Sequence, residues 1–83
     1  MPHVNIRYYP RAFTAEQKEH LAEAVTIVIL EHFDGIREGS ISIALEPVAE
    51  SDWSETVVPD IKAHRELLIK TPTYVSEVQV GRS

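Results

Sequence analysis

The first residues of the chain alternate between apolar and polar positions. Val4, Ile6 and Tyr8 fall on one side of an extended segment at residues 3–9, and polar or aromatic residues fall between them. A period of two is typical of a half-buried strand. Pro10 ends the segment because proline has no N–H to donate to a sheet. The pattern predicts a first strand at residues 3–9.

The spacing then changes to that of a helix. Thr14 and Gln17 have the spacing of a capping box, and good helix formers follow them. We predict a helix over residues 15–33, closed by Asp34 and Gly35. Its last turns are apolar around nearly the whole circumference, whereas a helix packed on one side keeps a polar stripe. The helix is therefore expected to be covered on more than one side.

A second alternating segment follows at residues 39–46, where Ile41, Ile43 and Leu45 share one side and Pro47 stops the pattern. A strand, a crossover helix and a second strand form a βαβ unit, whose strands run parallel. The predicted fold class is therefore α/β, with two parallel strands and a long crossover helix.

The remainder of the chain predicts a short second helix at residues 60–70. Pro59 suits the first turn of such a helix, and Thr71-Pro72 ends it. Ile61, Leu67 and Leu68 form the expected packing face. Weak alternation at residues 74–80 predicts an edge strand or a partner contact. We expect one domain over residues 1–83, with 75–83 as a flexible or partner-contacting tail.

Length and composition favour an oligomer. A chain of 83 residues buries only about 60% of the surface that its unfolded form exposes. It has no cysteine, which excludes disulfides and thiolate zinc sites and is compatible with a reducing compartment. Two parallel strands are not a stable sheet by themselves. A symmetric homodimer is the default way to complete such a sheet.

Charge and hydropathy exclude other classes of partner. The net charge is −5 and the pI is near 5.2, so the basic stripe that binds nucleic acid is missing. No secretory signal pattern opens the chain. The longest apolar run, residues 27–30, is far too short to span a bilayer. We expect a soluble protein of the cytoplasm that binds neither nucleic acid nor membrane.

The usual catalytic side-chain motifs are missing. The four histidines form no HExxH pattern or His/carboxylate cluster, so no metal site is predicted. Only three glycines are present, with no phosphate-binding loop, and no GxSxG nucleophile motif occurs. What remains is the residue that follows the initiator methionine, Pro2.

Removal of Met1 would leave Pro2 with a free secondary amine. An ordinary α-amino group has a pKa of about 8, and apolar surroundings or a nearby arginine favour its neutral form. A neutral amine can take a proton from a carbon next to a carbonyl. Pro2 shares strand parity with Val4 and Ile6, and the candidate cations are Arg7, Arg11 and Arg37. The alternative is that a proline in second position carries no function.

Ordered motifs along residues 2–74 resemble the 4-oxalocrotonate tautomerase superfamily. They are MPH-V-N-I at the start, Pro10-Arg11 after the first strand, EQK at the start of the long helix, SISIALEP in the second strand, Trp53, and LLIKTPTY. SISIAL, Trp53 and LIKxPxY bring the chain closest to the longer, dimeric PptA-like tautomerases.

The resemblance implies a βαβ subunit and an enzyme that interconverts keto and enol forms of small 2-oxo acids, such as phenylpyruvate, without a cofactor. Pro2 would be the general base, Arg11 would hold the substrate carboxylate, and Trp53 would keep the pocket dry or serve as a core residue. Hexameric relatives carry an arginine where this chain has Ser42, and Arg11 lies two residues farther from the helix start than theirs. Carboxylate recognition must therefore differ from theirs.

Two alternatives remain open. The same fold can serve a non-catalytic oligomer that binds a small acid or a protein. The same amine can instead serve decarboxylation, hydration or dehalogenation, as in other members of the superfamily. Retention of Met1 would favour the binding alternative, because an acylated Pro2 nitrogen has no basic lone pair.

Overall fold

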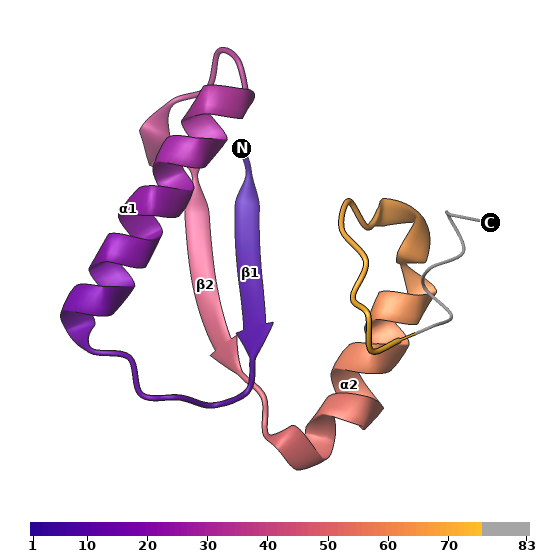
Figure 1. Cartoon of the computed structure of the whole chain (residues 1–83). Helices are drawn as coiled ribbons and strands as arrows, with labels where there is room; N and C mark the ends of the chain where they lie inside the picture. Colours follow the sequence, from indigo (N-terminus) through magenta and orange to yellow (C-terminus); the bar gives the residue numbers. More distant parts are fainter. Residues whose placement is uncertain (76–83) are drawn as a thin grey trace. The chain divides into compact units, whose positions relative to one another are not determined.

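A computed structural model of the chain describes residues 1–75. The chain divides into two compact units, Met1–Pro47 and Val48–Ser83. The first unit holds a strand, a helix, a short 3-10 turn and a second strand, and the second unit holds a helix and another 3-10 turn. This order confirms the predicted α/β class with a βαβ tautomerase-type subunit (Figure 1).

The sheet of the first unit has two parallel strands. Strand β1 (His3–Tyr8) pairs with β2 (Ser42–Pro47) in a register that runs from His3 opposite Ser42 to Tyr8 opposite Pro47. Helix α1 (Ala15–His32) makes the crossover between them and lies against one face of the sheet (Figure 1). Parallel strands and a crossover helix are therefore confirmed.

The predicted alternation gives the sheet one apolar face and one polar face. Val4 and Ile6 are half-buried and stand opposite Ile43 and Leu45, on the face toward α1. The other face begins with the exposed side chains of His3 and Asn5 and is polar. In the first unit, one face of the sheet therefore meets the crossover helix and the other carries polar groups.

Both ends of α1 are formed by local hydrogen bonds. Thr14 Oγ1 accepts from the Gln17 backbone N–H at 3.0 Å, and Gln17 Oε1 accepts from the Thr14 N–H at 2.9 Å, which confirms the capping box. At the other end, His32 Nδ1 bonds the Val28 carbonyl at 2.9 Å. Gly35 turns the chain away with a φ of 78°, a left-handed value that glycine adopts freely.

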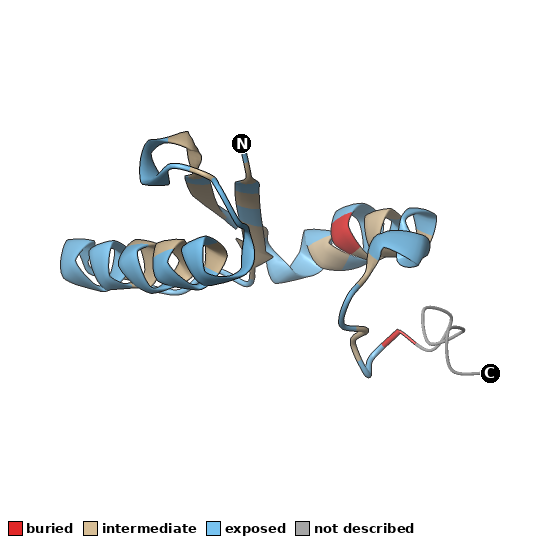
Figure 2. Ribbon diagram, turned by 90° about the horizontal axis from the view of Figure 1, so that it is seen from above, coloured by how far each residue is buried: buried red, intermediate tan, exposed pale blue. Residues whose placement is uncertain are grey.

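Apolar side chains of α1 stay uncovered in the single subunit. Ile27, Val28, Leu30 and Phe33 are all exposed, with Ile27 and Val28 at about half of their full surface. Among residues 1–75 only Val57 and Val75 are buried hydrophobics, and Figure 2 shows exposed and half-buried residues almost everywhere. A core this small supports the expectation that another subunit covers the helix.

The second strand begins later than predicted. Residues 38–40 form a 3-10 turn, η1 (Glu38–Ser40), and β2 starts at Ser42 rather than at residue 39. Ser40 explains the shift, because its Oγ donates to the Arg37 carbonyl at 2.7 Å and so favours a turn over an extended chain. Pro47 belongs to the strand, which is an edge strand of the two-stranded sheet and tolerates a proline.

The predicted second helix is present, but its predicted bounds, residues 60–70, are wrong. Helix α2 spans Glu50–Ala63, contains Pro59 in its interior, and is followed by the 3-10 turn η2 (Arg65–Leu67). Trp53, Val57 and Ile61 recur at four-residue intervals and are half-buried or buried, so they form the packing face of this helix. Leu67, predicted to pack, is instead 71% exposed.

Two features allow the earlier start of α2 despite its proline. Glu50 and Asp52 place negative charge in the first turn, where it complements the helix dipole. Burial of the Val57 side chain stabilises the helix and offsets the loss of the backbone hydrogen bond that Pro59 cannot donate. The helix ends where His64 N–H and Nδ1 both bond the Asp60 carbonyl.

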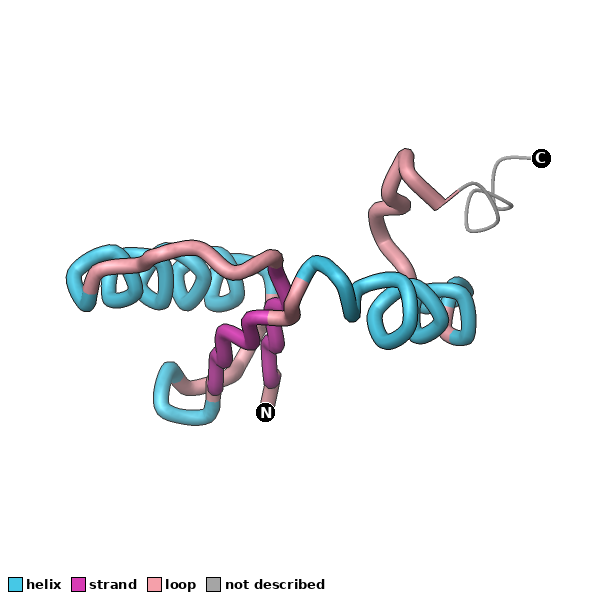
Figure 3. The backbone as a smooth tube through the Cα atoms, turned by 90° about the horizontal axis from the view of Figure 1, so that it is seen from below, coloured by secondary structure: helices cyan, strands magenta, loops and turns pink. Residues whose placement is uncertain are grey.

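Two further observations complete the fold. The predicted edge strand covers residues 74–80, and the predicted tail begins at residue 75. Both predictions concern residues beyond Val75, which lie outside the described residues. Neither helix within residues 1–75 combines the length and hydropathy needed to cross a membrane. Figure 3 shows the loops that join the elements, including the connection from β1 to α1.

Candidate active site

Pro2 directly precedes β1, at the end of the sheet where both parallel strands begin. Its carbonyl accepts a hydrogen bond from the Ser42 backbone N–H at 3.2 Å, which ties it to the first residue of β2. Pro2 is half-buried and, by strand alternation, shares the α1 side of the sheet with Val4 and Ile6. Met1 is 99% exposed, and in the chain described here it acylates the Pro2 nitrogen. Removal of Met1 is therefore what would create the amine.

A polar contact lies next to Pro2 on the opposite face of the sheet. His3 Nδ1 and Ser42 Oγ are 2.6 Å apart, within hydrogen-bond distance, and the two residues are register partners. The sequence alone does not reveal this contact, because it depends on the register between strands 39 residues apart.

Arg11 lies in the connection between β1 and α1, beyond the other end of β1. Its guanidinium carbon is 5.3 Å from the centre of the Phe13 ring, within the range of a cation–π interaction. Phe13 in turn meets Tyr8 edge to face, with ring centres 5.4 Å apart. Tyr8 is the last residue of β1, so these aromatic contacts hold Arg11 close to that end of the sheet.

A single subunit does not bring Pro2 and Arg11 together. The six residues of β1, followed by Tyr9 and Pro10, separate them, and a strand of six residues extends about 20 Å. Figure 1 shows the N-terminus at one end of β1 and the connection to α1 leaving from the other. Arg37, another cation considered from the sequence, precedes η1 and β2 and so belongs to the same end of the sheet as Pro2.

Trp53 lies on α2, in the second unit. It is half-buried, and its indole N–H donates to the Tyr74 hydroxyl oxygen at 3.3 Å. Val57, one turn later on the same helix, is buried. Trp53 is thus part of the packing face of α2 and is also oriented by Tyr74, a residue whose role the sequence does not reveal.

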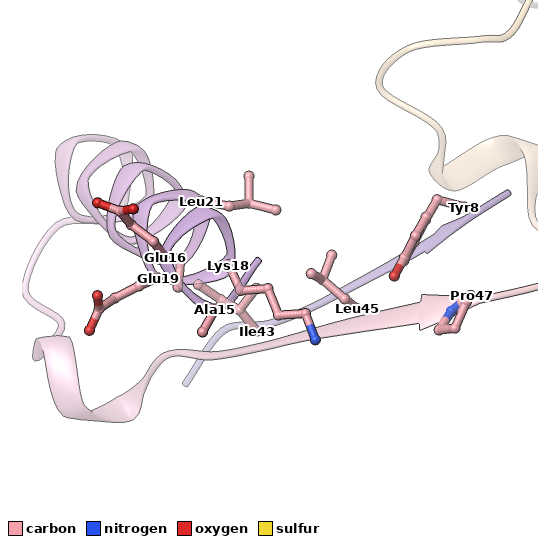
Figure 4. Close-up of a pocket in the computed structure, with 10 residues that line it drawn as sticks. Tyr8, Ala15, Glu16, Lys18, Glu19, Leu21, Ile43, Leu45 and Pro47 are labelled. Carbon is pink, nitrogen blue, oxygen red and sulfur yellow. The ribbon is translucent and has the colours of Figure 1, made fainter. Parts of the chain in front are cut away.

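An open groove with a volume of about 740 Å³ runs between the first half of α1 and the strands. Figure 4 shows the Lys18 side chain extending toward the strands, while the carboxylates of Glu16 and Glu19 point away from Tyr8. Pro2 is not one of its lining residues, which are Tyr8, Ala15, Glu16, Lys18, Glu19, Leu21, Ala22, Ile43, Leu45 and Pro47. The groove therefore extends along β2 from Ile43, the register partner of Val4, to Pro47, the partner of Tyr8, and neither Pro2 nor Arg11 lines it.

Metal ligation finds no support in residues 1–75. No group of three or more histidine, cysteine, aspartate or glutamate side chains gathers there in a way that could hold an ion. His32 and His64 each bond the carbonyl four residues earlier in their own helix.

Comparison with known proteins agrees with this architecture. The model of a family described as "Tautomerase enzyme" matches residues 2–57, and the chain belongs to this tautomerase family. It is an enzyme of the tautomerase class, and so an isomerase.

Individual relatives extend the match beyond the βαβ unit. The chain is similar to tautomerase PptA of Shigella sonnei strain Ss046, with 38% identity over 74 residues that cover 89% of this chain and 97% of that protein. It is 38% identical, with the same coverage, to tautomerase PptA of Escherichia coli O139:H28. Tautomerase PptA of Pectobacterium carotovorum is 35% identical over 75 residues. The predicted kinship with PptA-like tautomerases is therefore confirmed.

Proposed function

We propose that this protein is a cofactor-independent tautomerase of small 2-oxo acids such as phenylpyruvate, with Pro2 as its general base. The observation that carries the proposal is the position of Pro2. It follows a fully exposed Met1, directly precedes β1, and is tied to β2 through its carbonyl. The family match also begins at this residue.

The chemistry follows from a secondary amine next to an apolar strand face. The lone pair of the Pro2 nitrogen takes the proton of the enol hydroxyl, and the electrons of that O–H bond form the C=O bond. The electron pair of the C=C bond then accepts the proton from the Pro2 ammonium at carbon, which gives the keto form and restores the amine. The half-buried position of Pro2 favours its neutral, basic form.

The intermediate is an enolate whose negative charge needs a cation. We propose Arg11 for this role, as the residue that holds the substrate carboxylate. Because Pro2 and Arg11 lie at opposite ends of β1, the Arg11 that serves one Pro2 comes from a partner subunit. Trp53 is proposed to keep water away from the pocket, and its bond to Tyr74 would fix its ring.

A two-fold dimer would bring the two residues together. In the two-stranded sheet β1 pairs with β2 on one edge, so its other edge can pair with the same strand of a second copy. Two such strands related by a two-fold axis run antiparallel, so the first residue of one lies beside the last residue of the other. We therefore propose a homodimer in which each Pro2 faces the partner subunit's Arg11. The lack of cysteine is compatible with action in the cytoplasm.

The proposal is tested by intact mass and by ketonisation of enol phenylpyruvate, followed by ultraviolet absorbance. We expect the protein from its own cells to lack Met1, and Pro2→Ala to lower kcat by about 10²- to 10⁴-fold, the usual contribution of a general base. Equal rates for the two proteins would refute the assignment of Pro2. Loss of methionine without ketonisation would point to decarboxylation, hydration or dehalogenation, and retained Met1 would favour a binding protein.

A further inference from the structure

Ser42 makes one hydrogen bond to each residue of the dipeptide Pro2-His3, which leads into β1. Its backbone N–H donates to the Pro2 carbonyl at 3.2 Å, and its Oγ lies 2.6 Å from His3 Nδ1. The first bond belongs to the backbone ladder and the second joins side chains on the polar face of the sheet. One residue of β2 therefore holds both residues of this dipeptide.

The bonds matter because they restrain the residue that would carry the amine. A proline has no amide N–H, so its carbonyl is its one backbone group that can join the ladder. After Met1 is removed, Pro2 becomes the first residue of the chain, and chain ends fray unless they are tied down. After the backbone bond to the Pro2 carbonyl, the side-chain bond of the neighbouring His3 is the restraint nearest to the Pro2 nitrogen, and it limits the direction in which that nitrogen points.

We propose that Ser42, acting through His3, is a positioning residue for the Pro2 amine. The inference rests on the proposed role of Pro2 as general base. Loss of the Ser42 hydroxyl leaves the backbone ladder intact but releases the His3 ring, so the first two residues sample more orientations. A smaller fraction of molecules then holds the amine within reach of the substrate proton, which lowers kcat rather than raising KM.

The same face of the sheet provides a matched control. Asn5 Nδ2 donates to Glu46 Oε1 at 3.0 Å, which is also a side-chain bond between β1 and β2. This pair is also exposed and also joins side chains of the two strands, although its acceptor is a carboxylate, and it lies two or more residues farther from Pro2. If the bonds acted only through the stability of the sheet, loss of either pair would lower kcat. If the His3–Ser42 bond positions the amine, only loss of that pair would lower kcat.

The experiment compares Ser42→Ala, Ser42→Thr, His3→Ala, the double variant of Ser42→Ala with His3→Ala, and Asn5→Ala. Each is measured for kcat and KM in ketonisation of enol phenylpyruvate and for Tm, with Pro2→Ala as the reference. We expect Ser42→Ala and His3→Ala each to lower kcat about fivefold, as the loss of one neutral hydrogen bond allows. The double variant should lose no more than either single one, since both remove the same bond.

We expect Ser42→Thr, which keeps a hydroxyl, to keep most of the rate, and Asn5→Ala to leave kcat unchanged with a similar loss of Tm. Wild-type kcat in Ser42→Ala, or equal losses of kcat in Ser42→Ala and Asn5→Ala, would overturn the positioning role. The proposed function would stand in that case, provided that Pro2→Ala still shows its much larger loss of kcat. Full activity in Pro2→Ala would instead refute the proposed function itself, and the positioning role with it.

Discussion

The two ends of β1 are built in different ways. At the Pro2 end the restraints are two hydrogen bonds: the Ser42 backbone N–H donates to the Pro2 carbonyl, and the Ser42 hydroxyl is hydrogen-bonded to the His3 ring. At the Arg11 end they are aromatic, with Phe13 between the Arg11 guanidinium and the Tyr8 ring. The first suits an amine that must point in one direction, and the second suits a cation that must stay charged and exposed. Each end holds half of the proposed site, so it is the proposed site, with Pro2 from one chain and Arg11 from the other, that needs two subunits.

The largest effect at the Arg11 end is expected from removal of its charge. Arg11→Ala should raise KM for phenylpyruvate enol by about 10- to 100-fold, because a charge-assisted bond to a carboxylate is lost. Arg11→Lys should recover part of the loss as a point charge. Steady-state kinetics measure the split between kcat and KM.

The contrast with Pro2 makes this prediction informative. Pro2→Ala should act on kcat, whereas Arg11→Ala should raise KM and also lower kcat, because this cation is proposed both to bind the carboxylate and to stabilise the enolate. The change in KM would therefore distinguish the two ends of β1. An unchanged KM in Arg11→Ala would transfer the role of carboxylate binding to another cation, of which Arg37, at the Pro2 end, is the next candidate.

A mixing experiment tests whether the two halves come from different chains. Pro2→Ala and Arg11→Ala subunits are unfolded together in equal amounts, refolded and assayed. If each site takes Pro2 from one chain and Arg11 from the other, a mixed dimer has one intact site, and about a quarter of wild-type activity should return. If both residues came from one chain, no intact site would form and no activity would return.

A smaller effect is expected where Phe13 supports Arg11. Phe13→Leu keeps an apolar side chain but removes the ring face under the guanidinium, a contact worth about 0.5–1 kcal/mol at an exposed site. We expect KM to rise about two- to fivefold with little change in kcat. Phe13→Tyr keeps the ring and serves as the control. A change in kcat alone would show that the aromatic contact does not act through Arg11.

Much of the βαβ unit could be predicted because its signals are local. Alternation placed β1, and the spacing of Thr14 and Gln17 placed the start of α1 at the residue where the capping box forms. Alternation predicts the start of β2 too early, because the Ser40 hydroxyl bonds the Arg37 carbonyl and favours a turn there. The alternation of apolar and polar residues carries no information about such a turn.

The second unit was harder to predict because packing outweighed a local signal. Pro59 is typical of a helix start, yet here it lies inside α2, whose apolar face begins at Trp53. The four-residue spacing of Trp53, Val57 and Ile61 carried the correct information. For the site, parity predicts that Pro2 shares a side of the sheet with Val4 and Ile6, and this stays a prediction. The bond between His3 and Ser42 could not be found, because it needs the register of two distant strands.

The smallest effect on activity is expected at the start of α1, which lies beyond the Arg11 connection. Thr14→Ala removes the side-chain oxygen that accepts from the Gln17 N–H, and loss of such a cap costs about 1 kcal/mol of the free energy of unfolding. Urea unfolding should measure that loss, with Thr14→Ser as the control that keeps the cap. We expect kcat and KM to stay at wild-type values, because the cap stabilises the helix and the contacts of Phe13 hold Arg11 independently. A rise in KM as large as that of Phe13→Leu would mean that Arg11 is placed by the helix start, and the two ends of β1 would then differ less than their contacts indicate.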